Sequence, residues 1–373
     1  MKLVIFGLTV SSSWGNGHAT LWRGLCRALA RKGHAVVFYE RDVDYYAVNR
    51  DLAELPGGRL VLYPDWEQAA PAAARDLRDA DAAIVTSYCP DGIAASDLVL
   101  GSTVPVRAFY DLDTPVTLAA LKAGEEVAYI GPRGLRDFDL VLSYTGGLAL
   151  AELRRVLGAR HVAPLYGSVD PAVHRPTEPL ERFRADLSYL GTFAADRQAA
   201  LEELFIEPAR LRPQARFLMG GACYPSDFPW TSNLFFVRHL PPPEHAAFFS
   251  SCRLTLNVTR AAMAAMGHCP SGRLFEAAAS GAPVVSDAWE GLDSFFTPGS
   301  EILLARTALD VCAALDLSDG ELRRIATAAR ERTLAEHTSD RRAAELESLL
   351  QGVVRGLPSA VARPANAAQA GAA

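Results

Sequence analysis

The sequence predicts an α/β protein built from two doubly wound domains, each a parallel sheet with helices on both faces. Short apolar runs alternate with helical stretches, which is the pattern of parallel strands buried on both sides. This pattern covers the first half of the chain and starts again near residue 187. A chain of 373 residues is also too long for one ordinary hydrophobic core. Two Rossmann-like domains facing each other across a cleft are therefore expected.

The first domain is predicted to span residues 1–170. Residues 3–7 indicate a buried strand, 19–32 a helix, and 35–39 the next strand. Further short apolar runs predict strands at 60–63, 82–86, 106–110 and 140–143. Because ligands of such sheets bind at the carboxyl ends of the strands, the loops after these strands are expected to line the cleft.

The second domain is predicted over residues 171–337, after a segment rich in proline and glycine at 164–176. Its strands are expected at 187–190, 216–219, 234–237, 254–258 and 283–286. Its helices are expected at 195–205, about 243–251, 273–280 and 318–337. A terminal helix is predicted at 338–355, and the Ala-, Pro- and Gly-rich residues 356–373 are predicted to form a disordered tail.

The composition is typical of a globular enzyme and argues against several classes of function. Half of the residues are hydrophobic and 21% are charged. The net charge of -6 gives no support to nucleic-acid binding, and no apolar run reaches the length of a membrane span. The first apolar run is too short for a signal peptide. The six cysteines form no C-x-x-C pair, which predicts reduced thiols in a cytoplasmic protein and argues against a zinc site.

The most informative segment is 269–286, where a Pro-Ser-Gly turn opens a helix and a Gly-Ala-Pro sequence ends it. The free N–H groups near Ser271 and Gly272 form an anion site, and the planar guanidinium of Arg273 suits phosphate. Glu276, about one turn further along, is placed to accept hydrogen bonds from vicinal hydroxyls such as those of a ribose. The pattern predicts a nucleotide diphosphate site. The alternative is an ordinary helix cap with a surface Arg and a solvated Glu.

A glycine-containing loop follows the first predicted strand and includes Gly15, Asn16, Gly17 and His18. The two glycines allow the backbone to approach a ligand closely. His18, at the predicted start of the helix, is a candidate general base for a sugar hydroxyl, with helix capping as the alternative. The loop lacks the G-x-G-x-x-G order of a dinucleotide site.

Asp111 and Asp113 come directly after the predicted strand 106–110. Two carboxylates at a strand end can orient a polyol acceptor or bind a metal, and an Asp before a proline is also ordinary turn chemistry. We favour a turn that contacts the acceptor, and we assign no metal site.

Two strand ends of the second domain add candidates for binding a diphosphate. Gly191 and Thr192 end one strand, where glycine lets phosphate approach the backbone, and Arg197 begins the next helix. Arg260 follows another strand and is placed to face the diphosphate. For Arg197, an exposed surface charge is an equally good interpretation.

Together these motifs resemble those of the CgeB-like glycosyltransferases (the spore maturation protein CgeB family), which have the two-Rossmann type B glycosyltransferase fold. The resemblance covers nearly the whole chain to about residue 354, and its most specific block is 270–293. It rests also on segments 12–18, 111–115, 167–176, 189–197 and 257–260. It implies transfer of a sugar from a nucleotide diphosphate sugar to an acceptor hydroxyl, with no metal or other cofactor.

The resemblance also implies roles for individual residues. Glu276 matches the Glu that binds the ribose, while Gly191 and Arg197 match the diphosphate side. His18 matches a position near the donor sugar that is the base in some inverting relatives. The terminal helix would cross back onto the first domain. Retaining relatives often carry a Glu where this chain has His268, so the anomeric outcome stays open.

Three functions remain open from the sequence. The first is a cytoplasmic glycosyltransferase that uses a nucleotide-sugar donor and an unknown acceptor. The second is a nucleotide-sugar epimerase on the same fold, which would work without an acceptor. The third is a catalytically silent surface-assembly protein that keeps the fold.

Overall fold

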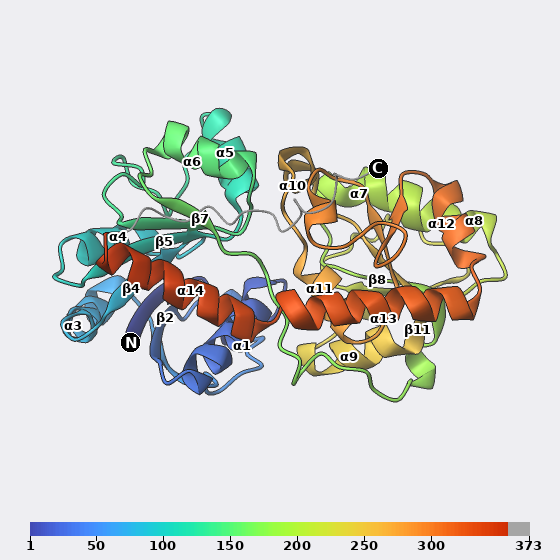
Figure 1. Cartoon of the computed structure of the whole chain (residues 1–373), viewed down its shortest axis with the longest axis horizontal. Coiled ribbons are helices and arrows are strands. Elements are labelled where there is room, and N and C mark those ends of the chain that lie inside the picture. The colour runs from blue at the N-terminus through green and yellow to red at the C-terminus, as the bar shows by residue number, and fades with distance from the viewer. Residues whose placement is uncertain (357–373) are drawn as a thin grey trace, which may run out of the picture.

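A computed structural model describes residues 1–356 and shows two parallel sheets side by side, each covered by helices (Figure 1). The first sheet has the strand order β3-β2-β1-β4-β5-β6-β7 and the second has the order β10-β9-β8-β11-β12-β13. Every strand pair in both sheets is parallel. Apolar side chains pack against both faces of each sheet. The predicted fold class, two doubly wound Rossmann-like domains, is therefore confirmed.

The first sheet and its helices occupy the first part of the chain. Its strands are β1 (Lys2–Gly7), β2 (Ala35–Arg41), β3 (Gly58–Tyr63), β4 (Ala82–Thr86), β5 (Val106–Asp111), β6 (Leu140–Ser143) and β7 (Val162–Pro164). Its helices are α1 (His18–Arg31), α2 (Asp44–Ala47), α3 (Trp66–Leu77), α4 (Gly92–Leu100), α5 (Thr114–Lys122) and α6 (Leu148–Leu157). The central strands β1 and β4 are buried along almost their whole length, as expected for strands covered on both faces.

The second sheet repeats the arrangement. Its strands are β8 (Ala185–Leu190), β9 (Phe217–Gly221), β10 (Leu234–Arg238), β11 (Cys252–Asn257), β12 (Val284–Asp287) and β13 (Leu303–Ala305). Its helices are α7 (Gln198–Leu201), α8 (Glu207–Leu211), α9 (Pro242–Ser251), α10 (Ala261–Met266), α11 (Gly272–Ala279), α12 (Ala308–Leu315) and α13 (Asp319–Glu336). The helix predicted at 195–205 is irregular, since a 3₁₀ turn precedes α7 and a π turn joins α7 to α8.

The last helix, α14 (Ser339–Val354), packs against the first domain. Helices α13 and α14 run end to end along one side of the molecule (Figure 1). Ala343, Leu346 and Leu350 of α14 belong to the same apolar cluster as the buried side of α1. Arg342 of α14 holds this helix to the segment between the two sheets, because its guanidinium donates to the carbonyls of Tyr166 and Gly167. The segment that joins the sheets is therefore tied directly to α14.

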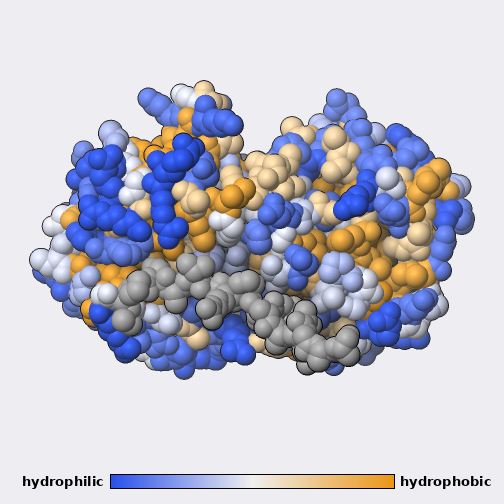
Figure 2. Space-filling model, turned by 45° about the horizontal axis from the view of Figure 1, so that its top comes forward, coloured by the Kyte–Doolittle hydropathy of each residue, from blue (hydrophilic) through white to orange (hydrophobic). Residues whose placement is uncertain are grey.

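No helix within residues 1–356 is both long and apolar enough to cross a bilayer. The predicted disordered tail lies outside the described residues, apart from Gly356. In the space-filling view a notch separates the two halves of the molecule along its upper edge (Figure 2).

Candidate functional site

A cleft of about 470 Å³ lies between the two domains and is lined by loops and helix ends from both. The lining includes thirteen of the fourteen candidate site residues: Gly15, Asn16, Gly17, His18, Asp113, Gly191, Thr192, Arg197, Arg260, Ser271, Gly272, Arg273 and Glu276. Several of them follow strands of the two sheets, as the fold requires of a cleft at the carboxyl ends of parallel strands. The remaining candidate, Asp111, does not line the cleft.

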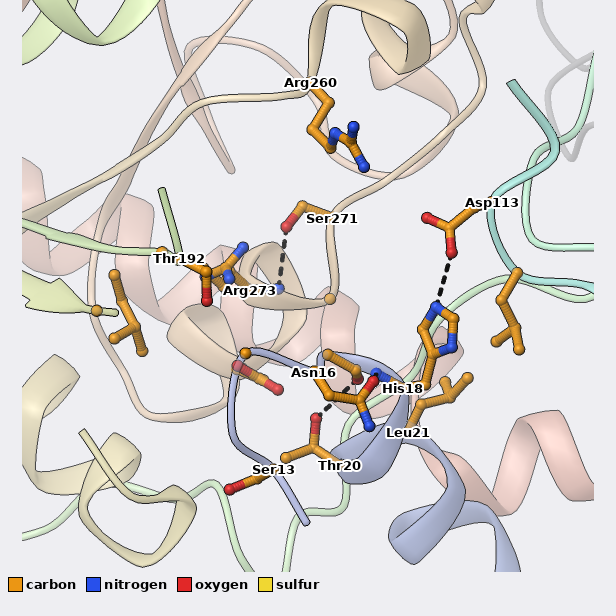
Figure 3. Close-up of a pocket in the computed structure, with 18 of the residues that line it drawn as sticks. Ser13, Asn16, His18, Thr20, Leu21, Asp113, Thr192, Arg260, Ser271 and Arg273 are labelled. Atoms are coloured by element: carbon orange, nitrogen blue, oxygen red, sulfur yellow. Dashed lines mark hydrogen bonds and ion pairs between the residues drawn. The ribbon is translucent and has the colours of Figure 1, made fainter. Parts of the chain in front are cut away.

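The start of α11 forms the second-domain wall of the cleft. Ser271 is the N-cap, and its hydroxyl accepts from the N–H of Arg273 (Figure 3). The helix is anchored by an apolar side that includes Leu274 and Phe275, both fully buried. The side chain of Arg273 has no hydrogen-bond or ion-pair partner within residues 1–356. An N-terminus with free N–H groups and an unengaged guanidinium is suited to a bound anion.

Glu276 lies one turn into α11, with only 8% of the residue exposed. No described group donates a hydrogen bond to its carboxylate. Two histidines face it instead: His174 Nε2 lies 4.0 Å from Oε1, and His245 Nδ1 lies 3.8 Å from Oε2. Burial alone would raise the pKa of Glu276, but positive charge from His174 and from Arg273 outweighs burial and holds that pKa below its ordinary value. Glu276 is thus an ionised, buried acceptor at the cleft wall.

His245 stands at the same wall on α9. Its Nε2 lies 3.2 Å from the carbonyl oxygen of Leu240, so Nε2 carries the proton. Burial lowers the pKa of His245 to about 4, which leaves the ring neutral near pH 7. The lone pair of Nδ1 then points toward Glu276.

On the opposite wall, His18 and Asp113 form a pair, with His18 Nε2 lying 2.8 Å from Asp113 Oδ2 (Figure 3). His18 is the first residue of α1, and its N–H donates to the side-chain oxygen of Asn16. The amide of Asn16 in turn donates to two carbonyls of its own loop, which fixes the loop. Gly15 has φ of +60°, a conformation that favours glycine.

The pairing bears on the hypothesis that His18 is the general base. A carboxylate only accepts hydrogen bonds, so the proton lies on His18 Nε2. His18 Nδ1 is buried and has no hydrogen-bond partner in the described structure. Burial would raise the pKa of Asp113, but His18 and Arg260 outweigh burial and hold it below its ordinary value. Asp113 therefore offers a free, ionised acceptor oxygen to the cleft. His18 offers none, because its Nε2 carries the proton and its Nδ1 is buried.

Asp111 is a correction to the sequence interpretation, which placed it in the cleft with Asp113. It is the last residue of β5 and is fully buried. Its Oδ1 accepts from the N–H of Asp113 and from the hydroxyl of Thr117. Burial raises the pKa of Asp111 to about 7. Asp111 thus supports the turn that presents Asp113 and does not reach a ligand.

The other two arginines of the cleft are held by neighbouring side chains. Arg260 pairs with Asp196, at 3.1 Å between Nε and Oδ2, and Arg197 donates to the hydroxyl of Tyr189. That hydroxyl also explains Gly191, because a Cβ there would lie 2.6 Å from it. The glycine therefore makes room for the Tyr189 hydroxyl, while its own N–H donates to the carbonyl of Gly220 and its carbonyl accepts from Tyr224.

Comparisons of the sequence and the structure with known proteins identify the fold that carries this site. Residues 197–348 match a family described as "Glycosyl transferase-like", and no curated protein matches the chain. Sucrose-phosphate synthase from Thermosynechococcus elongatus is similar in structure, with a TM-score of 0.71 at 15% identity over 95% of this chain and 99% of that one. The chain has the type B glycosyltransferase fold.

Two further structures share this fold. Anabaena HepE in complex with UDP-glucose gives a TM-score of 0.66 at 12% identity, over 93% of this chain and 99% of that one. The N-terminal domain of Candida albicans trehalose-6-phosphate phosphatase gives 0.64 at 10% identity, over 94% and 96%.

His268, which stands where retaining relatives often have a Glu, serves the contact between the domains. Its carbonyl accepts from the N–H of Gly146 in the first domain, and its N–H donates to the carbonyl of Glu290. Its φ is +46°, and its ring lies against Gly147 and Gly291, where a Cβ would come within 2.5 Å of it. The residue does not line the cleft.

The sequence analysis did not single out His174 or His245. His174 lies in the segment between the sheets and His245 on α9, each far in sequence from Glu276. His174 lies within segment 167–176, which carries the resemblance as a linker and was assigned no site, and His245 has no neighbouring motif. Only the packing of that segment and α9 beside α11 brings them together.

Proposed function

We propose that this protein is a glycosyltransferase of the CgeB-like group that transfers a sugar from a nucleotide diphosphate sugar to an acceptor hydroxyl without a required metal. One observation carries the proposal. The anion-binding start of α11, with Glu276 one turn inside it, faces the Asp113–His18 pair across a single cleft.

The second-domain wall supplies the donor site. The N–H groups at the start of α11 and the guanidinium of Arg273 meet the diphosphate, and Gly191 lines the cleft with them. Glu276 accepts the hydroxyls of the ribose. UDP-glucose is the first donor to test, because HepE of the same fold was solved with it.

The first-domain wall supplies the acceptor site. The acceptor hydroxyl donates its proton to the free oxygen of Asp113, while its oxygen forms a bond to the anomeric carbon of the donor. The bond from that carbon to the diphosphate breaks, and the diphosphate leaves with the electron pair. Its new charge is met by the start of α11 and by Arg273. His18 holds Asp113 through the Nε2–Oδ2 hydrogen bond.

The proposal is tested by incubating the protein with a panel of UDP- and other nucleotide sugars, with and without pooled sugar, lipid and peptide acceptors. Mass spectrometry would follow both the sugar product and the nucleotide. We expect nucleotide release and a glycosylated product only when an acceptor is present. Conversion of one nucleotide sugar into another without an acceptor would show an epimerase instead. Tight nucleotide binding with no conversion of any donor would show a binding protein that keeps the fold.

A further inference from the structure

His174, His245 and Glu276, called here the His–His–Glu cluster, come from three separate elements. His174 lies in the segment between the sheets, His245 on α9 and Glu276 on α11. One possible ligand atom from each residue lies within 4.8 Å of the others. His174 and Glu276 are buried, and His245 is half-buried at the cleft wall. No other such group of ligating side chains occurs in the part of the chain that the structure describes.

The hydrogen bonds of the cluster leave its lone pairs unsatisfied. His245 Nε2–H donates to the Leu240 carbonyl, so its Nδ1 is an acceptor that faces another acceptor, Glu276 Oε2, at 3.8 Å. Both ring nitrogens of His174 are buried without a hydrogen-bond partner in the described residues. Buried polar atoms without partners are rare, and each calls for a partner such as a water or an ion.

We propose that the His–His–Glu cluster binds one zinc-like divalent ion through an imidazole nitrogen of each histidine and the carboxylate of Glu276. Two imidazoles and one carboxylate form a recognised zinc ligand set. Bond lengths of about 2.0–2.2 Å in a tetrahedral site put neighbouring ligand atoms about 3.3–3.6 Å apart. The two histidines lie 3.8 and 4.0 Å from the two oxygens of Glu276, and one ligand atom of each residue lies within 4.8 Å of the others, so the side chains would have to move inward to hold an ion.

Two further features fit a metal site. A zinc-bound imidazole usually donates its other N–H to a carbonyl or carboxylate, which fixes the ring. His245 already does so through Leu240. Because His245 and Glu276 line the cleft, an ion held by the cluster could be reached from the cleft, where water would complete its four ligands.

A metal here would inhibit the protein and not assist it, an inference that rests on the proposed function. Glu276 is the carboxylate assigned to the ribose, and a zinc ion would take its oxygen lone pairs. Zinc and the nucleotide should therefore compete for the cleft. Free zinc would inhibit sugar transfer, whereas removal of zinc would leave turnover unchanged.

The first experiment measures zinc alone on untagged, chelator-treated protein by competition with a chromophoric zinc chelator. Cys223, the exposed thiol, is changed to Ser in every sample so that it cannot bind the ion. One zinc per chain is expected. Replacing one ligand in His174→Gln or His245→Gln should weaken zinc binding at least about tenfold, since even outer-shell changes cost that much.

The matched control is His239→Gln, because His239 also lines the cleft but is not part of the cluster. It should bind zinc as tightly as the unaltered protein. X-ray absorption on the protein whose only change is Cys223→Ser gives a readout that depends on no cluster variant, and should show two imidazoles with oxygen ligands and no sulfur. Absence of zinc binding, sulfur ligation, or equal zinc binding by the ligand variants and His239→Gln would overturn the site.

The second experiment titrates UDP by calorimetry with and without zinc at one equivalent. Zinc should weaken UDP binding to the unaltered protein. The variant His174→Gln keeps Glu276, so it should still bind UDP, and added zinc should no longer change that affinity. This variant also controls for zinc chelation by UDP in solution. If the UDP affinity were the same with and without bound zinc, the proposed competition between zinc and the nucleotide would be wrong. Failure of UDP to bind zinc-free protein would overturn the nucleotide assignment while leaving the zinc site standing.

Discussion

Replacing Glu276 by Gln should weaken nucleotide binding while preserving the shape of the cleft wall. In the free protein the carboxylate is buried and receives no hydrogen bond from a described group. Bound ribose hydroxyls would supply the missing donors. A hydrogen bond to a charged group is worth about 1.5–3 kcal/mol net, so an affinity loss of roughly ten- to hundredfold is expected.

The assay is calorimetric titration with UDP and with 2′-deoxy-UDP. The unaltered protein should lose affinity when the 2′-hydroxyl is removed, whereas Glu276→Gln should bind both nucleotides with similar, weak affinity. Such non-additivity is the signature of a direct contact in a double-mutant cycle. Arg273→Ala should weaken UDP to a similar extent, and its binding should depend less on salt because a phosphate contact is lost.

Glu331→Gln is the matched control, since Glu331 is an exposed residue of α13 outside the cleft. It should bind both nucleotides as the unaltered protein does. The reasoning fails if Glu276→Gln binds UDP at full strength, or if it still discriminates between UDP and 2′-deoxy-UDP. The ribose would then lie elsewhere in the cleft.

Three further predictions follow from the same contacts. Asp113→Asn should keep UDP affinity and lower kcat about 10²–10⁴-fold, whereas His18→Ala should lower kcat less. A larger loss of kcat in His18→Ala than in Asp113→Asn would make His18 the base. A loss of UDP affinity in His18→Ala would make His18 a contact of the donor. Turnover should survive EDTA, and its loss with rescue by magnesium or manganese would show a required metal. Burial lowers the pKa of His337 from 6.5 to about 3, so only the unfolded chain takes up this proton as pH falls below 6.5. Urea unfolding should therefore show about 2 kcal/mol lost between pH 7 and 5 from this residue, and His337→Gln should flatten that slope.

The sheets were largely predictable because buried parallel strands leave continuous apolar runs in the sequence. The run at 82–86 is β4 and the run at 140–143 is β6, residue for residue. Strand β13 was not predicted, since it is an edge strand of only three residues, only one of them buried, and gives no such run. Helix α12, which follows it, was missed with it.

The site was predictable where its residues share one loop or one helix turn. Ser271, Arg273 and Glu276 stand within a single turn and a half of α11, so their spacing alone brings them together. Spacing could not tell Asp111 from Asp113, because either carboxylate of such a pair can point into the sheet. The structure decides it, since β5 ends at Asp111 and keeps that side chain in the core.

The departure at His268 shows why a missing motif residue does not by itself argue for a silent protein. A Glu lost from this position would matter only if the position faced the cleft. Here the backbone of His268 bridges the domains, and its φ of +46° turns the chain toward the contact with Gly146. In the proposed function, the carboxylate that faces the donor site is that of Asp113, which lines the cleft on the other wall. The residues to which we assign transfer therefore all line the cleft, whereas His268 lies at the contact between the domains.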